Sequence, residues 1–165
     1  MTNGKRVIVA VDESEESMFA LSWCLTDFLA GNLHPYATLI LLYVKPPPPA
    51  YSSIDVAGQL FSGDVLATME KHGRDLTESV MNRAAEVHRI SENNCVKVEK
   101  KVGSGVAEDV ICNAVDELQA DVLVMGTHDY GFLKRAILGS VSDYCAKHAN
   151  CPVVVVKRPV PRHSR

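Results

Sequence analysis

Residues 6–16 of the chain read RVIVAVDESEE, an apolar run rich in β-branched side chains that stops at acidic and hydroxyl residues. A continuous apolar run of this length is typical of a β-strand covered on both faces. Ser14 and the two glutamates after it have the pattern of a helix N-cap with an acidic first turn. The stretch therefore predicts a buried strand at residues 6–11 that leads into a helix ending near Gly31.

The alternation of strand and helix continues along the rest of the chain. Further apolar or alternating runs predict strands at residues 38–44, 96–102, 121–125 and 152–157. Helical spacing of apolar residues predicts helices at residues 64–90, interrupted at Gly73, at 106–118 and at 140–149, with a turn at 103–105. This order predicts an α/β fold, a five-stranded parallel sheet with helices on both faces.

The chain is expected to form one domain over residues 1–165, because its length is close to that of an average domain and no linker divides it. The ordered core is predicted at about residues 5–158. A proline run followed by an aperiodic stretch predicts a surface loop at residues 46–63. Residues 159–165 are predicted to be a basic, frayed tail.

Composition excludes several classes of protein. With 47% hydrophobic and 22% charged residues, a chain of this size can bury a core without disulfides or metals. A formal charge of -3 is too near neutral for a nucleic-acid-binding protein, and no apolar run is long enough to cross a membrane. The 5 cysteines form no C-x-x-C pair, which fits a reducing compartment. We therefore predict a cytoplasmic or nucleocytoplasmic protein.

Ligands of parallel sheets bind outside the carboxyl ends of the strands, where the winding reverses. This rule points to Asp12 after the first strand, to Val44 after the second, and to residues 126–142 after the fourth. Glycines at both ends of that last stretch allow a close approach to a ligand and positive φ angles. Ser140 opens a helix whose N–H groups suit a phosphate, and with Asp143 it resembles a capping box. The alternative is a long loop and a well-capped helix that bind nothing.

Other chemistries lack their motifs. The sequence contains no P-loop, no H-E-x-x-H zinc motif and no serine-hydrolase elbow. Gly103 and Gly105 lack the third glycine of a dinucleotide fingerprint. Cys145, His148 and Cys151 lack a fourth metal ligand, and Cys145 is expected to face the core. We therefore predict no metal site.

Three segments carry a resemblance to a known family: VIVAVDES at residues 7–14, LLYV at 41–44 and MGTHDYGFLKRAILGSVSDYCAKHANCPVVVVK at 125–157. Together they resemble the universal stress protein family, and within it the small single-domain plant type. The last segment is similar to the ATP-binding signature of that family, Gly-two residues-Gly-nine residues-Gly-Ser/Thr. Gly126, Gly139 and Ser140 fill its first, third and fourth positions, whereas Asp129 replaces the second glycine.

The resemblance implies a Rossmann-like domain that binds ATP, or AMP or ADP, with or without Mg²⁺. It also implies a homodimer with a regulatory role in stress, in which any ATP hydrolysis is slow and the protein is not primarily an enzyme. The resemblance also implies which residues contact each part of the nucleotide. Asp12, with the backbone of Ala10 and Val11, and Val44 correspond to the adenosine-binding positions, and Met125 and Gly126 to those along the ribose and the first phosphate. The phosphate-binding positions are Gly139, Ser140, Val141 and Ser142, and His128 and Asp129 belong to the same candidate site.

Two alternatives stay open beside this interpretation. The same fold could serve as a nucleotide-independent interaction or chaperone-like protein that offers only its surfaces. An ATP-hydrolysing enzyme would have to draw its catalytic groups from Asp129, Lys134 and Arg135. For assembly, the valine run at residues 153–156 would be an aggregation hazard as an unpaired edge strand, so we predict a two-fold symmetric homodimer formed through it. No nucleic acid or membrane partner is expected.

Overall fold

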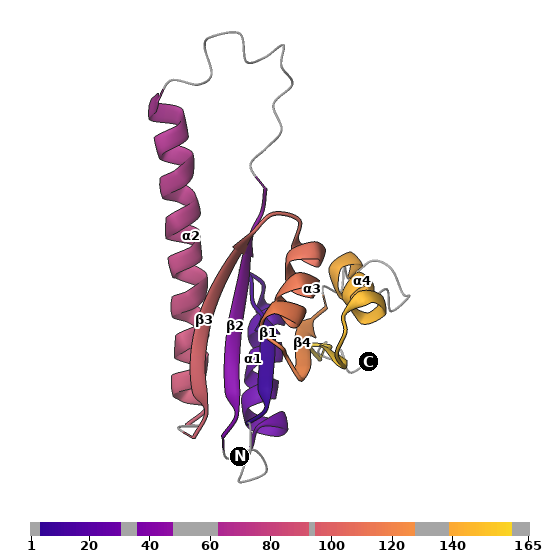
Figure 1. Ribbon diagram of the computed structural model, residues 1–165. Coiled ribbons are helices and arrows are strands. Elements are labelled where there is room, and N and C mark those ends of the chain that lie inside the picture. Colours follow the sequence, from indigo (N-terminus) through magenta and orange to yellow (C-terminus); the bar gives the residue numbers. More distant parts are fainter. Residues whose placement is uncertain (1–3, 31–35, 48–62, 93–94, 128–138, 160–165) are drawn as a thin grey trace, which may run out of the picture.

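The computed structural model describes residues 4–30, 36–47, 63–92, 95–127 and 139–159 of the chain. In chain order the elements are β1 (Arg6–Ala10), α1 (Glu15–Trp23), the π-helical turn η1 (Cys24–Phe28), β2 (Thr38–Lys45), α2 (Gly63–Ile90), β3 (Lys97–Ser104), α3 (Ala107–Glu117), β4 (Val122–Gly126), α4 (Ser140–His148) and β5 (Val153–Val156). Figure 1 shows a sheet with helices on either side of it. The predicted α/β fold with a five-stranded parallel sheet is confirmed.

The strands are ordered β3-β2-β1-β4-β5, so β1 lies at the centre of the sheet. Val9 of β1 pairs with Leu41 of β2 on one side and with Val124 of β4 on the other. The chain therefore runs outward from β1 through β2 to β3, and then crosses back to form β4 and β5 on the other side. Such a reversal sends the loops after β1 and β4 in opposite directions and leaves a crevice at the carboxyl ends of these strands.

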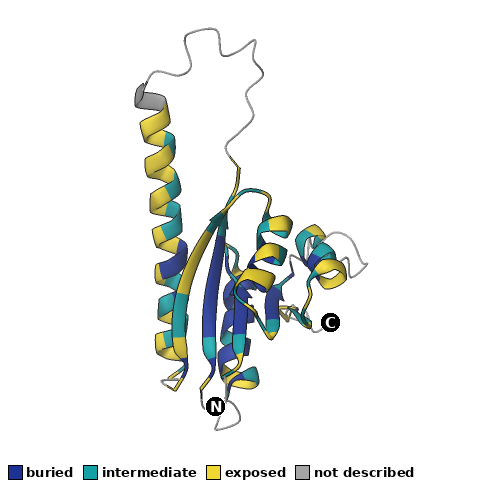
Figure 2. Cartoon of the chain, viewed as in Figure 1, coloured by how far each residue is buried: buried dark blue, intermediate teal, exposed yellow. Residues whose placement is uncertain are grey.

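Different helices cover the two faces of the sheet. Val7 and Val9 are buried in one apolar cluster with residues of α1 and α2, whereas Ile8 is buried in a second cluster with residues of α3 and α4. Figure 2 shows the central strands as the most buried part of the protein. Because both faces of β1 are inside the protein, the strand is continuously apolar from Val7 to Ala10 instead of alternating with polar residues.

The helix α2 is continuous and longer than the sheet. The predicted interruption at Gly73 is wrong, since the helix runs from Gly63 to Ile90. Its 28 residues span about 42 Å, compared with about 26 Å for the 8 residues of β2, so its N-terminal half extends past the strands (Figure 1). Nothing lies within 4 Å of a Cβ at Gly73, and a glycine in such a helix costs only about 1 kcal/mol relative to alanine.

Two further boundaries differ from the prediction. The helix expected to reach Gly31 ends as α1 at Trp23 and passes into η1, where Leu29 N–H donates to Cys24 O at 2.8 Å. The turn expected at residues 103–105 lies mostly within β3, because the long partner strand β2 extends the pairing to Ser104.

The predicted surface loop at residues 46–63 and the predicted tail at residues 159–165 lie mostly outside the described residues. Gly63 already belongs to α2. Within the described ranges, none of the helices combines the length and the low polarity that crossing a membrane requires.

Candidate functional site

A cavity of about 390 Å³ lies at the carboxyl ends of β1, β2 and β4, where the winding of the sheet reverses. Its volume falls within the range of small-molecule sites. Every predicted site residue that the structure describes lines this cavity: Ala10, Val11, Asp12, Val44, Met125, Gly126, Gly139, Ser140, Val141 and Ser142. His128 and Asp129 lie outside the described residues. The structure thus brings together residues from four parts of the chain.

The segment after β1 is folded tightly by its own hydroxyl groups. Asp12 Oδ1 accepts hydrogen bonds from the Ser14 N–H, at 2.9 Å, and from the Ser14 hydroxyl. Ser14 Oγ accepts from the Ser17 N–H at 3.1 Å, which confirms the predicted N-cap of α1. The buried Ser17 hydroxyl donates to Asp12 O, at 3.1 Å, and accepts from Asp12 N–H, at 3.0 Å. Asp12 is therefore part of the helix cap as well as of the cavity wall.

Tyr43 connects the end of β2 to this segment. Its hydroxyl donates to Glu13 Oε1 at 3.2 Å, and both residues line the cavity. Burial, followed by the negative charge of Glu13, raises the pKa of Tyr43 to about 12. The phenol is therefore a protonated donor at neutral pH. The sequence analysis missed this pair, although a tyrosine inside an aliphatic strand is itself a sign that its hydroxyl needs a buried partner.

Arg83 of α2 holds the same segment from outside the cavity. Its Nη1 donates to Glu13 O at 2.9 Å, and its Nη2 donates to Glu15 Oε1 at 2.6 Å. Arg83 is not among the described residues that line the cavity. It is 70 positions from Glu13, and the sequence carries no signal for such a contact.

The opposite wall is the start of α4. Asp143 N–H makes the first intrahelical bond, to Gly139 O at 2.9 Å, so the N–H groups of the three residues before it have no partner within the helix. Those residues, Ser140, Val141 and Ser142, all line the cavity. The wall therefore presents backbone donors and the positive end of a helix, which is a favourable arrangement for an anion.

The predicted capping box at Ser140 is wrong. The N-cap is Gly139, and among the described residues no side chain caps the first turn of the helix. Asp143 instead pairs with Lys147 one turn further along, at 2.8 Å, and the Ser142 hydroxyl donates to Gly139 O at 2.9 Å. Gly139 has φ −51°, so the positive φ expected for a glycine at this end of the loop is absent. Its N–H donates to Thr127 Oγ1 at 3.2 Å, which links the start of α4 to the end of β4.

Gly126 allows two walls of the cavity to meet. A Cβ at this position would lie 2.5 Å from the carbonyl oxygen of Glu16 and 2.9 Å from the backbone nitrogen of Ser17. Those distances are too short for any side chain, and the obstructing atoms are backbone atoms of α1. The sequence predicts that this glycine allows a ligand to come close. In the structure, the absence of a side chain at Gly126 allows β4 to pack against the first turn of α1.

The charged side chains among the described lining residues are carboxylates, Asp12 and Glu13. Lys134 and Arg135, from which an ATP-hydrolysing enzyme would have to draw its catalytic groups, lie outside the described residues. Within the described part of the chain, the positive potential that reaches the cavity comes from helix N-termini, that of α4 and those of α1 and α3, whose N-cap Ser14 and first residue Ala107 also line the cavity.

The predicted burial of Cys145 is confirmed, since it is fully enclosed in the cluster beneath α3 and α4. Its sulfur lies 3.9 Å from that of Cys112, and burial raises its pKa to about 12. All five cysteines are free thiols. Among the described residues, no group of three or more histidine, cysteine or acidic side chains is placed to hold a metal ion.

A parallel α/β sheet with a cavity at its switch point defines a class of small-ligand-binding domains. A family model described as the universal stress protein family matches residues 4–157, and the chain belongs to that family. It is 36% identical over 157 residues to a universal stress protein of Methanocaldococcus jannaschii, with 94% of this chain and 83% of that protein covered.

Plant relatives and solved structures are also similar. The universal stress protein A-like protein of Arabidopsis thaliana is 28% identical over 145 residues, which cover 84% of this chain and 77% of that protein. The match to a further Arabidopsis relative, PHOS34, covers 62% of that protein's length. A universal stress protein of Arabidopsis thaliana crystallised with AMP bound has a TM-score of 0.58 and 25% sequence identity, with 97% of this chain and 95% of that chain covered.

Proposed function

We propose that this chain binds an adenine nucleotide in the cavity at the carboxyl ends of β1, β2 and β4. The observation that carries the proposal is the convergence of the predicted residues from β1, β2, β4 and α4 around one cavity. An anion-binding helix start on one wall, opposite a polar loop on the other, suits a ligand with a phosphate at one end. AMP is bound in the similar Arabidopsis structure, which supports the same ligand class here.

In this proposal the ligand lies across the crevice. The backbone of Val11 and the carboxylate of Asp12 contact the ribose or the base, and Val44 lies beside the adenine edge. Met125 and Gly126 lie along the ribose and the first phosphate. The N–H groups at the start of α4, from Ser140 onward, receive the phosphate oxygens.

The charge of the cavity bears on which nucleotide fits best. Asp12 and Glu13 add negative charge to the described lining, and Asp129 stands where the family signature has a glycine. Two unit charges 4 Å apart repel by about 4 kcal/mol at an effective dielectric of 20. We therefore propose that AMP binds without a cation, whereas ATP binds more weakly and gains affinity from Mg²⁺.

Calorimetric titration tests this function. AMP, ADP and ATP are titrated into the full chain with and without Mg²⁺, and guanosine monophosphate serves as the control for the base. We expect saturable AMP binding with a 1:1 stoichiometry, little binding of the guanine nucleotide, and a larger Mg²⁺ effect for ATP than for AMP. Absence of binding for all three adenine nucleotides contradicts the proposal.

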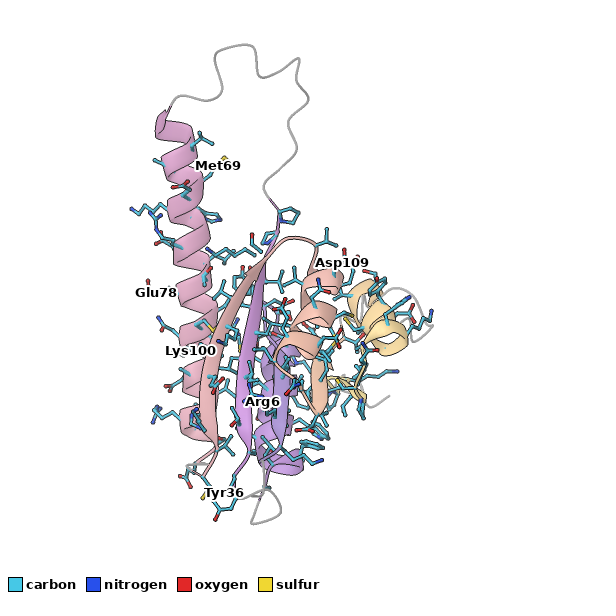
Figure 3. The ribbon with its side chains drawn as sticks, viewed as in Figure 1. Arg6, Tyr36, Met69, Glu78, Lys100 and Asp109 are labelled. Atoms are coloured by element: carbon cyan, nitrogen blue, oxygen red, sulfur yellow. The ribbon has the colours of Figure 1, made fainter. Side chains whose placement is uncertain are left out.

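We further propose that the functional unit is a cytoplasmic, regulatory homodimer of the stress response in which two copies pair through β5. β5 is one edge of the sheet, and its residues are all valine. The other edge, β3, carries the exposed Lys97, Lys100 and Lys101, the last two in mid-strand; Lys100 is labelled in Figure 3. Lysines on an edge strand oppose pairing with another chain, so of the two edges β5 is the one suited to it.

A nucleotide-independent interaction protein is the second candidate function. It is favoured by a groove of about 980 Å³ between the projecting half of α2 and the ends of β2 and β3. Leu66, Met69 and Leu76 line it, and Figure 3 shows Met69 and Glu78 on different sides of the helix. Substituting Met69 and Leu76 by Ser distinguishes the two functions, because it should leave AMP binding intact and abolish any suppression of aggregation of a denatured client protein.

A further inference from the structure

Arg83 lies outside the cavity, yet it is bonded to the segment that forms one cavity wall. Its guanidinium spans Glu13 O, at 2.9 Å, and Glu15 Oε1, at 2.6 Å, and so joins α2 to the loop between β1 and α1. We propose that Arg83 is a positioning residue for the nucleotide site, which holds residues 12–17 in the conformation that binds the ligand. This inference rests on the proposed adenine-nucleotide binding.

The Glu13 carbonyl needs a donor from outside its own helix. The N–H that would reach it in a longer helix belongs to Ser17, and that group donates instead to Ser14 Oγ at 3.1 Å. Arg83 supplies the donor, and a hydrogen bond from a guanidinium is stronger than one between neutral groups. The carbonyl is therefore fixed by α2 and by no bond within α1.

Glu13 is held at both its backbone and its side chain. While Arg83 binds the carbonyl, the Tyr43 hydroxyl donates to Glu13 Oε1 at 3.2 Å. The residues on either side of it, Asp12 and Ser14, both line the cavity. Anchoring Glu13 from α2 and β2 therefore fixes the two cavity-lining residues that flank it.

The ion pair with Glu15 is not what makes Arg83 important. The two side chains are 41% and 62% exposed, and exposed pairs contribute little to stability. The planar guanidinium matters because it reaches two acceptors at once, which the single ammonium of lysine does not reproduce. A ligand that requires this conformation of residues 12–17 binds less well when Arg83 no longer holds them. By thermodynamic linkage, binding of that ligand must also stabilise the part of α2 around Arg83.

The test compares Arg83→Met with a matched variant of the same helix. Arg89→Met is the control, because among the described residues the Arg89 guanidinium bonds only to Glu86 of α2, with Nε at 2.8 Å from Glu86 Oε2. Calorimetry measures the Kd for AMP, and hydrogen exchange follows residues 12–17 and 80–87 with and without AMP. We expect Arg83→Met to weaken AMP about three- to tenfold, Arg83→Lys to weaken it less, and Arg89→Met to leave it unchanged.

Hydrogen exchange separates positioning from general destabilisation. In the wild type and in Arg89→Met, AMP should slow exchange in both residues 12–17 and 80–87. In Arg83→Met the effect on 80–87 should vanish, whereas a merely structural role would leave it in place. Equal AMP affinity in the wild type and Arg83→Met, or equal weakening by the two methionine variants, overturns the inference. Failure of the wild type to bind AMP overturns the proposed function, and Arg83 is then a structural anchor.

Discussion

Gly126 is a position at which β4 and the first turn of α1 approach each other closely in the cavity walls. Replacing it with alanine would place a Cβ 2.5 Å from Glu16 O, an atom of the backbone that cannot rotate away. We expect Gly126→Ala to lower the free energy of unfolding by about 1–3 kcal/mol, the usual cost of overpacking, and to weaken AMP binding because the first turn of α1 must shift. Urea denaturation and calorimetry measure the two effects.

Gly73 is the matched control for that substitution, because a Cβ there meets nothing within 4 Å. Gly73→Ala should raise the free energy of unfolding by up to about 1 kcal/mol through helix propensity, with no change in AMP affinity. If the two alanine variants change stability in the same direction, the packing argument for Gly126 is wrong.

Tyr43 should give the protein a measurable dependence on alkaline pH. Its folded-state pKa of about 12 lies above the ordinary value of 10.0, so between these pH values the folded state holds a proton that the unfolded state has lost. The stabilisation is complete below pH 10 and declines as the pH rises toward 12. Two pKa units correspond to about 2–3 kcal/mol. Urea denaturation of the wild type and of Tyr43→Phe at pH 8, 10 and 11 measures how the free energy of unfolding depends on pH. The variant should lose less of that free energy over this range than the wild type.

Among single residues, those whose role is local could be predicted from the sequence. Ser14 is recognisable as an N-cap because its partner, the N–H of Ser17, is three positions away. The contacts of Arg83 and Gly126 depend on residues 68 or more positions away, and nothing in their neighbourhood in the sequence indicates them. The sequence singles out Gly126 for a close approach to a ligand, whereas the atoms that require a glycine there belong to α1.

At the scale of the element, the start of α4 can be tested by removing a backbone N–H together with the Ser140 hydroxyl. Ser140 is the first residue of the helix, a position that favours proline, and Gly139 before it has φ −51° and ψ 148°, which proline permits in its preceding residue. Ser140→Pro should therefore keep the fold and remove one N–H donor. We expect about tenfold weaker AMP binding, consistent with the loss of one hydrogen bond to a charged group.

Ser140→Ala is the control for that substitution, since it removes the hydroxyl and keeps the N–H. Calorimetry with both variants decides which group receives the phosphate, and circular dichroism checks that the helix is intact. An equal loss of AMP affinity for the two variants would show that the hydroxyl, which both variants lack, and not the helix backbone, is the main donor.

Elements with a strong period could be predicted from the sequence almost completely. β1 is apolar from Val7 onward because it is buried on both faces, and its run of valine and isoleucine clearly indicates a buried strand. The end of β3 and the continuity of α2 are less predictable. Pairing with β2 extends β3 past Gly103, and the helix propensity of the surrounding residues continues α2 through Gly73. In both cases a weak local signal is outweighed by the rest of the element.

At the scale of the whole molecule, the two edges of the sheet predict how copies assemble. Val155 lies half-buried in β5, and Val102 lies exposed in β3 on the opposite edge. Val155→Lys should convert a dimer to a monomer, because a charge on an edge strand opposes pairing, whereas Val102→Lys should have no effect. Light scattering at micromolar concentration measures the mass. A wild type with the mass of one chain contradicts the proposed dimer.

The lysines of β3 have a consequence for how far such assembly can proceed. Once two copies have joined through β5, the free edges at the two ends of the combined sheet are both β3, and each bears Lys97, Lys100 and Lys101. Growth by adding further strands would bring like charges together at every new junction. In the proposed dimer, a continuous sheet made this way stops at ten strands, a count that follows from two five-stranded halves, and further growth into filaments through β3 is disfavoured.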